Sequence, residues 1–188
     1  MLNKNKNSFF EFNRFSLVPF IEGLDLFLNF SIITFLSIFF LVGYDDRYSL
    51  PLIIFVVSLS FLSRIFSVPF WRKLSNFTKK KINCFYLLSI IYFIPIFLPS
   101  SFAYISLLIF IFCRFSIGIL FSSVSLSYLN SKLEKNEDSY FIKNILLMIL
   151  GMILASFMYL FVDDFFSNNQ LNNWAWKAIY IFLFLITA

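Results

Sequence analysis

Long apolar runs, broken only by short polar segments, take up most of this 188-residue sequence. A membrane-spanning helix needs about 20 mostly apolar residues, and the runs lack the alternation that marks the strands of a membrane barrel. They therefore predict helices that cross a membrane, because a helix satisfies its own backbone hydrogen bonds in lipid. We expect six spans, at residues 15–42, 49–71, 82–98, 102–129, 141–162 and 174–188.

The composition supports an integral membrane protein. Charged residues make up 13% of the chain, where soluble domains have about 25%. Residues 1–14 are polar and are predicted to form a cytoplasmic N-terminal segment. They are not expected to begin a signal peptide, because the apolar run that follows them is too long.

The lysines and arginines predict the orientation. They gather in the N-terminal segment and in the breaks after the second and fourth runs, which all fall on one side of a six-span path. Because basic loops stay in the cytoplasm, we expect a multi-pass protein of the cell (inner) membrane with a cytoplasmic N-terminus. The net charge of +5 then reflects topology and contact with membrane lipid, and no nucleic-acid partner is expected.

Four charged residues lie inside the apolar runs: Glu22, Asp25, Arg64 and Arg114. A charge at membrane depth costs at least about 2.5 kcal/mol, so such residues are usually functional. The two acids are three residues apart and share a helix face, while Arg114 lies about 18 Å along its run, near the midplane. We expect one acid to lie near Arg114. The acids then form part of a pathway or a purely structural ion pair, unless Glu22 reaches the cytoplasmic interface.

Enzymatic chemistry is not expected. The chain has no histidine and only two cysteines, so it lacks the commonest general base and metal ligand. The cysteines match no metal or redox spacing. We therefore predict no catalytic residues, no metal site and no cofactor.

Residues 61–81 resemble a signature of the major facilitator superfamily. In its metabolite:proton symporter branch, the proline/betaine transporter type, the second span ends with F-L-x-R-P-x-G, followed by G-x-x-x-D-R-x-G-R-K-K. Arg64 falls on the arginine of the first pattern, and Lys80 and Lys81 fall on the Arg-Lys pair of the second. Asn76 stands where the family has aspartate.

Three other segments resemble the same family in the same order. Residues 22–25, Glu-Gly-Leu-Asp, have the spacing of its first-span E-W-x-D. Residues 114–118, Arg-Phe-Ser-Ile-Gly, resemble its fourth-span R-x-x-Q-G, and residues 176–177, Trp-Lys, resemble the W-R that opens its sixth span.

The resemblance implies an all-α fold of six transmembrane helices, equal to the N-terminal half of the twelve-helix major facilitator fold. It implies proton-coupled symport of a small metabolite or osmolyte such as proline or betaine. Glu22, Asp25 and Arg114 would belong to the substrate and proton pathway. Arg64 would belong to a cytoplasmic gate, or else extend to the lipid headgroups.

The rest of that gate would be Asn76, Lys80 and Lys81. The expected partners are protons, a small solute, and either a separately encoded C-terminal half or a second copy. A non-transporting remnant of a decayed transporter is the alternative. It is indicated by the match to only half of the family fold, by Asn76, and by a glycine count of four.

Overall fold

The computed structural model describes residues 17–77, 84–133 and 140–188, and all regular secondary structure in this part of the chain is helical. The all-α class is thereby confirmed. The main helices are α1 (Val18–Ser31), α2 (Ile33–Phe40), α3 (Asp46–Phe77), α4 (Cys84–Phe93), α5 (Ala103–Leu133), α6 (Tyr140–Phe165) and α8 (Lys177–Thr187). Short segments join them: η3 (Ile94–Phe97), η4 (Ser100–Phe102), α7 (Asn168–Gln170) and the π-helix η5 (Leu171–Ala175).

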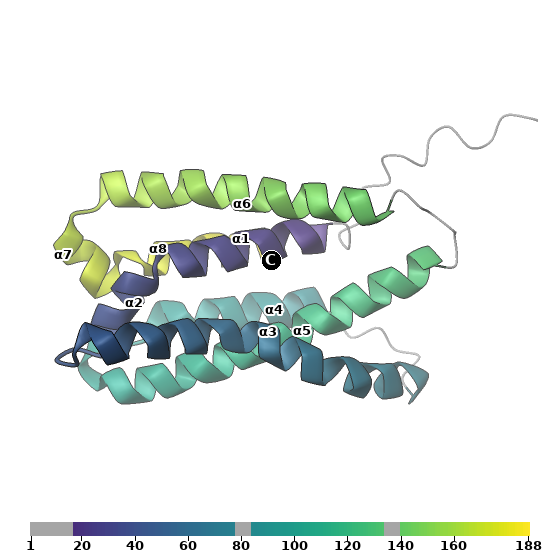
Figure 1. Cartoon of the computed structure of the whole chain (residues 1–188), viewed down its shortest axis with the longest axis horizontal. Helices are drawn as coiled ribbons and strands as arrows, with labels where there is room; N and C mark the ends of the chain where they lie inside the picture. The colour runs from purple at the N-terminus through teal and green to yellow at the C-terminus, as the bar shows by residue number, and fades with distance from the viewer. Residues whose placement is uncertain (1–16, 78–83, 134–139) are drawn as a thin grey trace, which may run out of the picture.

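Apart from α2, the main helices run roughly along one common direction (Figure 1). α6 is outermost on one side, α1 lies between it and the other helices, and α3 and α5 cross on the opposite side. The turns around residues 43, 99 and 167 lie at one end of the bundle. The first residues of α1, α4 and α6 and the last residues of α3 and α5 lie at the other end.

Three helical stretches in the described residues are long and apolar enough to cross a membrane: Arg47–Pro69, Ser100–Ser123 and Ile142–Phe165. α1 and α2 provide a fourth if the bent pair is one span. Two shorter apolar helices, Tyr86–Phe97 and Lys177–Thr187, occupy the third and sixth predicted runs. The chain is thus a helical protein with three to four helices that could span a membrane by length and composition.

The first predicted span is bent by 59° between α1 and α2. Near the end of α1, Asn29 Nδ2 donates to the carbonyl oxygen of Asp25 at 2.7 Å. Ser31 Oγ donates to the carbonyl oxygen of Phe27 at 2.9 Å. Polar side chains that bond to a carbonyl four residues back compete with the helical backbone and often bend it. These two contacts give a local cause for the bend.

The polar break predicted at residues 163–173 is largely helical instead. α6 continues to Phe165, and α7 and η5 follow after one short turn. α7 begins with a capping box, in which the Ser167 backbone N–H donates to Gln170 Oε1 at 3.0 Å. Such a box satisfies backbone donors at a helix start, so the polar residues begin a new helix there.

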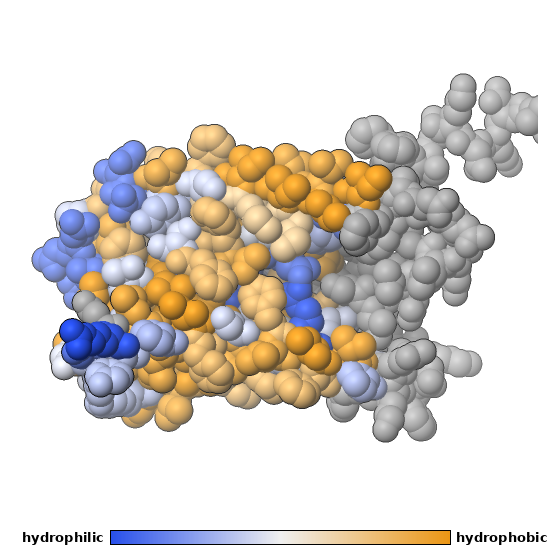
Figure 2. All heavy atoms as spheres, viewed as in Figure 1, coloured by the Kyte–Doolittle hydropathy of each residue, from blue (hydrophilic) through white to orange (hydrophobic). Residues whose placement is uncertain are grey.

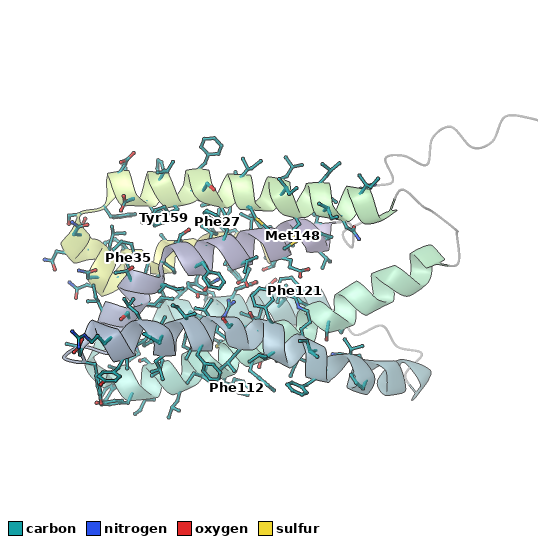
Figure 3. All side chains as sticks on the ribbon, in the orientation of Figure 1. Phe27, Phe35, Phe112, Phe121, Met148 and Tyr159 are labelled. Atoms are coloured by element: carbon teal, nitrogen blue, oxygen red, sulfur yellow. The ribbon has the colours of Figure 1, made fainter. Side chains whose placement is uncertain are left out.

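Glycine allows the closest helix crossings. A Cβ atom on Gly23 of α1 would overlap the backbone carbonyl oxygen of Met148 in α6, and one on Gly151 of α6 would overlap the backbone of α1. Gly118 of α5 meets the carbonyl oxygen of Ser60 in α3 in the same way. Figure 3 shows Met148 between α6 and α1. Small residues at such contacts are typical of membrane helix pairs.

The helix packing follows a repeated pattern. α1 packs on α6, α3 packs on α5, and α4 packs on both α8 and α5, while α8 also contacts α1. The first three predicted spans (α1–α2, α3, α4) correspond in order to the last three: α1 to α5, α3 to α6 and α4 to α8. Under this correspondence the packed pair α1–α6 matches the packed pair α5–α3. The packed pair α4–α5 likewise matches the packed pair α8–α1. The bundle therefore has an internal two-fold repeat in its contacts.

Apolar side chains fill the bundle and also cover its sides. Near the bend, Trp176 packs edge-on against Phe39 and Tyr180, with ring centroids 5.0 and 5.7 Å apart. On the face shown in Figure 2, hydrophilic residues cluster at the end that carries the α2–α3 turn and form one patch between α1 and α3. The remaining side surface is mostly apolar, and Phe112 of α5 is among its exposed residues (Figure 3). So large an apolar surface fits contact with lipid or with another protein.

Candidate functional site

The four charged residues within the apolar runs meet as two ion pairs in the bundle. Glu22 and Asp25 lie on one face of α1, Arg64 lies in α3 and Arg114 lies in α5. Asp25 pairs with Arg114, and Glu22 pairs with Arg64. Which of the two acids would lie near Arg114 could not be determined from their spacing, and it is Asp25.

The Asp25–Arg114 pair is bidentate and almost fully buried. Arg114 Nη1 donates to Asp25 Oδ1 at 2.8 Å, and Nη2 donates to Oδ2 at 3.1 Å. The side chain of Arg114 is 0% exposed and that of Asp25 is 5% exposed. Two parallel charge-assisted hydrogen bonds are among the strongest polar contacts in proteins, so this pair joins α1 firmly to α5.

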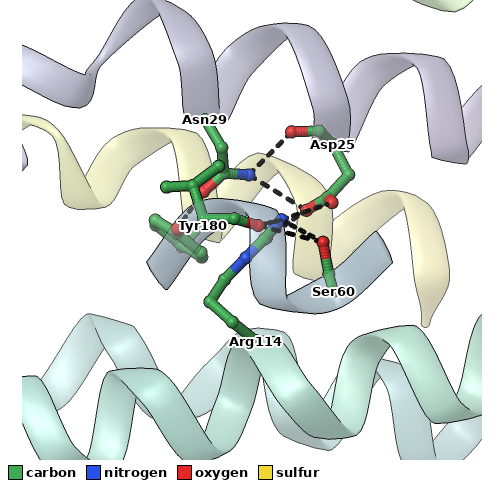
Figure 4. A network of polar contacts seen from close by, with 6 residues as sticks. Asp25, Asn29, Ser60, Arg114 and Tyr180 are labelled. Atoms are coloured by element: carbon green, nitrogen blue, oxygen red, sulfur yellow. Dashed lines mark hydrogen bonds and ion pairs between the residues drawn. The ribbon is translucent and has the colours of Figure 1, made fainter. Parts of the chain in front are cut away.

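A wider hydrogen-bond network holds the Asp25–Arg114 pair (Figure 4). Arg114 Nη2 also donates to Ser60 Oγ of α3 at 2.9 Å. Asn29 Nδ2 donates to Asp25 Oδ1 at 3.0 Å, and the Tyr180 hydroxyl of α8 donates to Asn29 Oδ1. We call these five residues the clamp: Asp25, Asn29, Ser60, Arg114 and Tyr180. The clamp joins four helices, α1, α3, α5 and α8.

Some buried polar atoms in and beside the two ion pairs have no hydrogen-bond partner in the described part of the chain. They include Arg114 Nε, Arg64 Nε and the hydroxyl oxygen of Tyr92 in α4. A buried polar group without a partner costs about 1–3 kcal/mol. The charged centre of the bundle is therefore well satisfied, but not completely.

The Glu22–Arg64 pair lies closer to the surface. Glu22 is 19% and Arg64 is 21% exposed, and one ion-pair contact, between Arg64 Nη1 and Glu22 Oε1, links them. The Arg64 guanidinium also lies over the rings of Phe61 in α3 and Phe121 in α5, 5.4 and 5.2 Å from their centroids. A cation at this distance from an aromatic face is attracted to it. Arg64 therefore has aromatic support in addition to its carboxylate partner.

Together the four charges form an electrically neutral group. Inside an apolar bundle this arrangement avoids an unpaired charge, which would be costly. No three His, Cys, Asp or Glu side chains in residues 17–77, 84–133 and 140–188 are close enough to hold a metal ion. The chemistry that these residues offer is reversible protonation of a carboxylate and binding of a charged group by an arginine.

The residues expected in a cytoplasmic gate are only partly described. Arg64 lies beside Glu22, and Asn76 belongs to the last turn of α3, where its backbone alone is described. Lys80 and Lys81 lie outside the described residues, as does the N-terminal segment at residues 1–14. A gate composed of these side chains stays a prediction.

Three members of the clamp were missed from the sequence. Asn29 and Ser60 each lie four residues from an intramembrane charge, Asp25 and Arg64 respectively. A polar residue one helical turn from a buried charge shares its face, so this signal could have indicated both. Tyr180 carried no comparable signal, because it approaches Asn29 only through the packing of α8 on α1.

Comparisons with protein-family models, with curated proteins and with solved structures find no match to this chain.

Proposed function

We propose that this chain is a module of a secondary active transporter in the cell membrane, which couples the movement of a small metabolite or osmolyte to protons. The observation that carries the proposal is the joining of Glu22, Asp25, Arg64 and Arg114, from three helices, inside an apolar bundle. Intramembrane ionisable residues usually belong to a substrate, ion or proton pathway. A protein that only had to stay in the membrane could place apolar residues at these positions.

The repeated packing of the helices supports a transporter fold. Many transporters are built from inverted structural repeats, with the solute bound near the membrane midplane. The exchange of the first three predicted spans with the last three, which preserves the helix contacts, is what two such repeats would give. On this proposal the short helices α4 and α8 complete six spans, and the chain equals one half of a major facilitator transporter.

The positions of the charged residues support the proposed orientation. Arg72 and Lys73 of α3 and Lys132 of α5 belong to the end of the bundle where α1 begins. Asp45 and Asp163 belong to the opposite end, where Arg47 also lies. Because basic residues stay on the cytoplasmic side, the N-terminus is cytoplasmic.

One half of such a transporter supplies one wall of the solute site. The second wall would come from further chain, from a separately encoded half, or from a second copy. The decisive experiment measures uptake of labelled proline or betaine into proteoliposomes under an inward proton gradient. It is performed with this chain alone and with any second half encoded beside it. Accumulation that a protonophore abolishes supports the proposal, and no accumulation of either solute in any combination contradicts it.

A non-transporting membrane protein is the second candidate. The clamp favours it, because Asp25 and Arg114 satisfy each other so fully that they can serve a structural role alone. Normal insertion and stability together with no solute uptake in any combination would support this candidate.

A further inference from the structure

The two ion pairs differ in exposure and in their surroundings, and we propose that they have different roles. Glu22–Arg64 is the pair that meets water, accepts the coupled proton and binds the carboxylate of the solute, whereas Asp25–Arg114 stays closed and holds the helices. This inference rests on the proposed transport function. It adds the pair that does the coupling and the group of the solute that this pair binds, its carboxylate.

Exposure separates the two pairs. Glu22 and Arg64 are 19% and 21% exposed, whereas Asp25 and Arg114 are 5% and 0% exposed. The hydrophilic patch in Figure 2 lies between α1 and α3, the helices that carry Glu22 and Arg64. A carboxylate that exchanges a proton with water, and an arginine that binds a dissolved solute, must both be reachable from water. Only the Glu22–Arg64 pair meets this condition.

The two ion pairs also differ in the free energy that it costs to break them. Breaking the Asp25–Arg114 pair would leave Arg114 buried with only neutral partners in α3, Ser60 and the Val57 carbonyl. Removal of one partner from a buried pair is strongly destabilising. Arg64 has the faces of Phe61 and Phe121 as a second support. The Glu22–Arg64 contact can therefore open without leaving a cation in an entirely apolar environment.

The ionisable groups on α1 and on the helices that pack in the same bundle determine the charge balance near Glu22. They are Asp25 on the same helix, Arg64 of α3, Arg114 of α5, Tyr92 of α4, and Lys143 in the first turn of α6, which packs on α1. The two acids and two arginines of the ion pairs cancel. When a proton from water forms an O–H bond on the Glu22 carboxylate, Arg64 loses its carboxylate partner, and the two ion pairs together carry one uncompensated positive charge.

Proton uptake and solute binding are coupled by this balance. Protonation of Glu22 frees Arg64 to accept a solute carboxylate in place of the Glu22 carboxylate, so that Arg64 is again paired with a carboxylate. Release of the solute returns Arg64 to Glu22, whose proton leaves to water on the other side. Solute and proton therefore enter and leave together, which is symport.

Two measurements test the inference. The first uses a cysteine-free variant (Cys84→Ser, Cys113→Ser), into which Glu22→Cys or the near-isosteric Ser60→Cys is introduced. A charged, water-soluble thiol reagent should label position 22 and leave position 60 of the clamp unlabelled. Equal labelling of both positions, or labelling of position 60 alone, would overturn the inference.

The second measurement compares transport modes in proteoliposomes. Glu22→Gln should lose accumulation of labelled betaine driven by a proton gradient, but keep the exchange of labelled for unlabelled betaine, which needs no net proton release. Glu22→Asp should restore the response to the gradient, and choline, which has a hydroxyl in place of the carboxylate, should not be accumulated. Gradient-driven accumulation by Glu22→Gln equal to wild type would overturn this inference alone. Wild type that accumulates neither betaine nor proline would instead refute the proposed function.

Discussion

Asp25 and Arg114 stabilise the bundle only as a pair, because either one alone would be a buried, uncompensated charge. The Asp25→Asn variant should therefore lose about 3–5 kcal/mol of stability, the cost of breaking a buried ion pair on one side. An unfolding titration in mixed detergent micelles would measure the loss. Loss of uptake in this variant would then follow from unfolding.

The double variant Asp25→Leu/Arg114→Met provides the control. Replacement of a buried ion pair by apolar residues of similar volume is often close to neutral. We expect the double variant to be more stable than either single variant. Strictly additive losses would show that the two side chains do not interact and would contradict the geometry described above.

Tyr180 and Tyr92 allow a comparison of two buried tyrosines that differ in the hydrogen bonding of the hydroxyl group. Both are fully buried, but the Tyr180 hydroxyl donates to Asn29, while the Tyr92 hydroxyl has no hydrogen-bond partner among the described residues. Tyr180→Phe should cost about 1 kcal/mol, the usual net value of one hydrogen bond, and Tyr92→Phe should cost less. The same unfolding titration measures the stability of both variants. A larger loss of stability for Tyr92→Phe than for Tyr180→Phe would contradict the hydrogen bonding described here.

At the scale of the helices, the contact between α1 and α6 depends on Gly23 and Gly151. Gly151→Ile should destabilise the protein by at least the roughly 1–3 kcal/mol that overpacking costs, because a Cβ there overlaps the backbone of α1. Leu150→Ile on the next, exposed residue of α6 is the control and should change stability little. Unfolding measurements that rank the two variants equally would exclude a close α1–α6 crossing.

The sequence patterns predicted where the long helices lie, but they did not predict where a helix bends or where a short helix begins. Long apolar runs predicted α3, α5 and α6, because the hydropathy of a segment is a sum over neighbouring residues. The bend between α1 and α2 escaped prediction, since apolar residues continue through it while Asn29 and Ser31 act on single carbonyl groups. The helical region after Phe165 was also missed, because the capping box of Ser167 and Gln170 is a local contact in a polar segment.

The candidate site was predictable only in part for the same reason. Charges inside apolar runs indicated four of its residues, and the spacing of Glu22 and Asp25 placed them on one helix face. The pairing of Asp25 with Arg114 and of Glu22 with Arg64 depends on how α1, α3 and α5 cross. Those crossings are fixed by contacts between residues far apart in the chain, which periodicity within one helix does not report.

At the scale of the whole molecule, the two ion pairs differ in place: one lies in the interior of the bundle and the other is partly exposed. The clamp joins four helices in its interior. Glu22 and Arg64 lie beside it with about one fifth of their side chains exposed. Transport by alternating access is largely a rigid-body motion of one half against another. On the proposed function, a bundle held together by the clamp would move as a unit while Glu22 and Arg64 exchange partners.

The most direct test of the account is whether protons move with the solute. Betaine is added to a weakly buffered suspension of proteoliposomes that contain the protein and any second half, and the external pH is recorded. We expect the medium to become more alkaline as betaine enters, and a protonophore to abolish this change. Entry of labelled betaine with no change in external pH would contradict proton coupling.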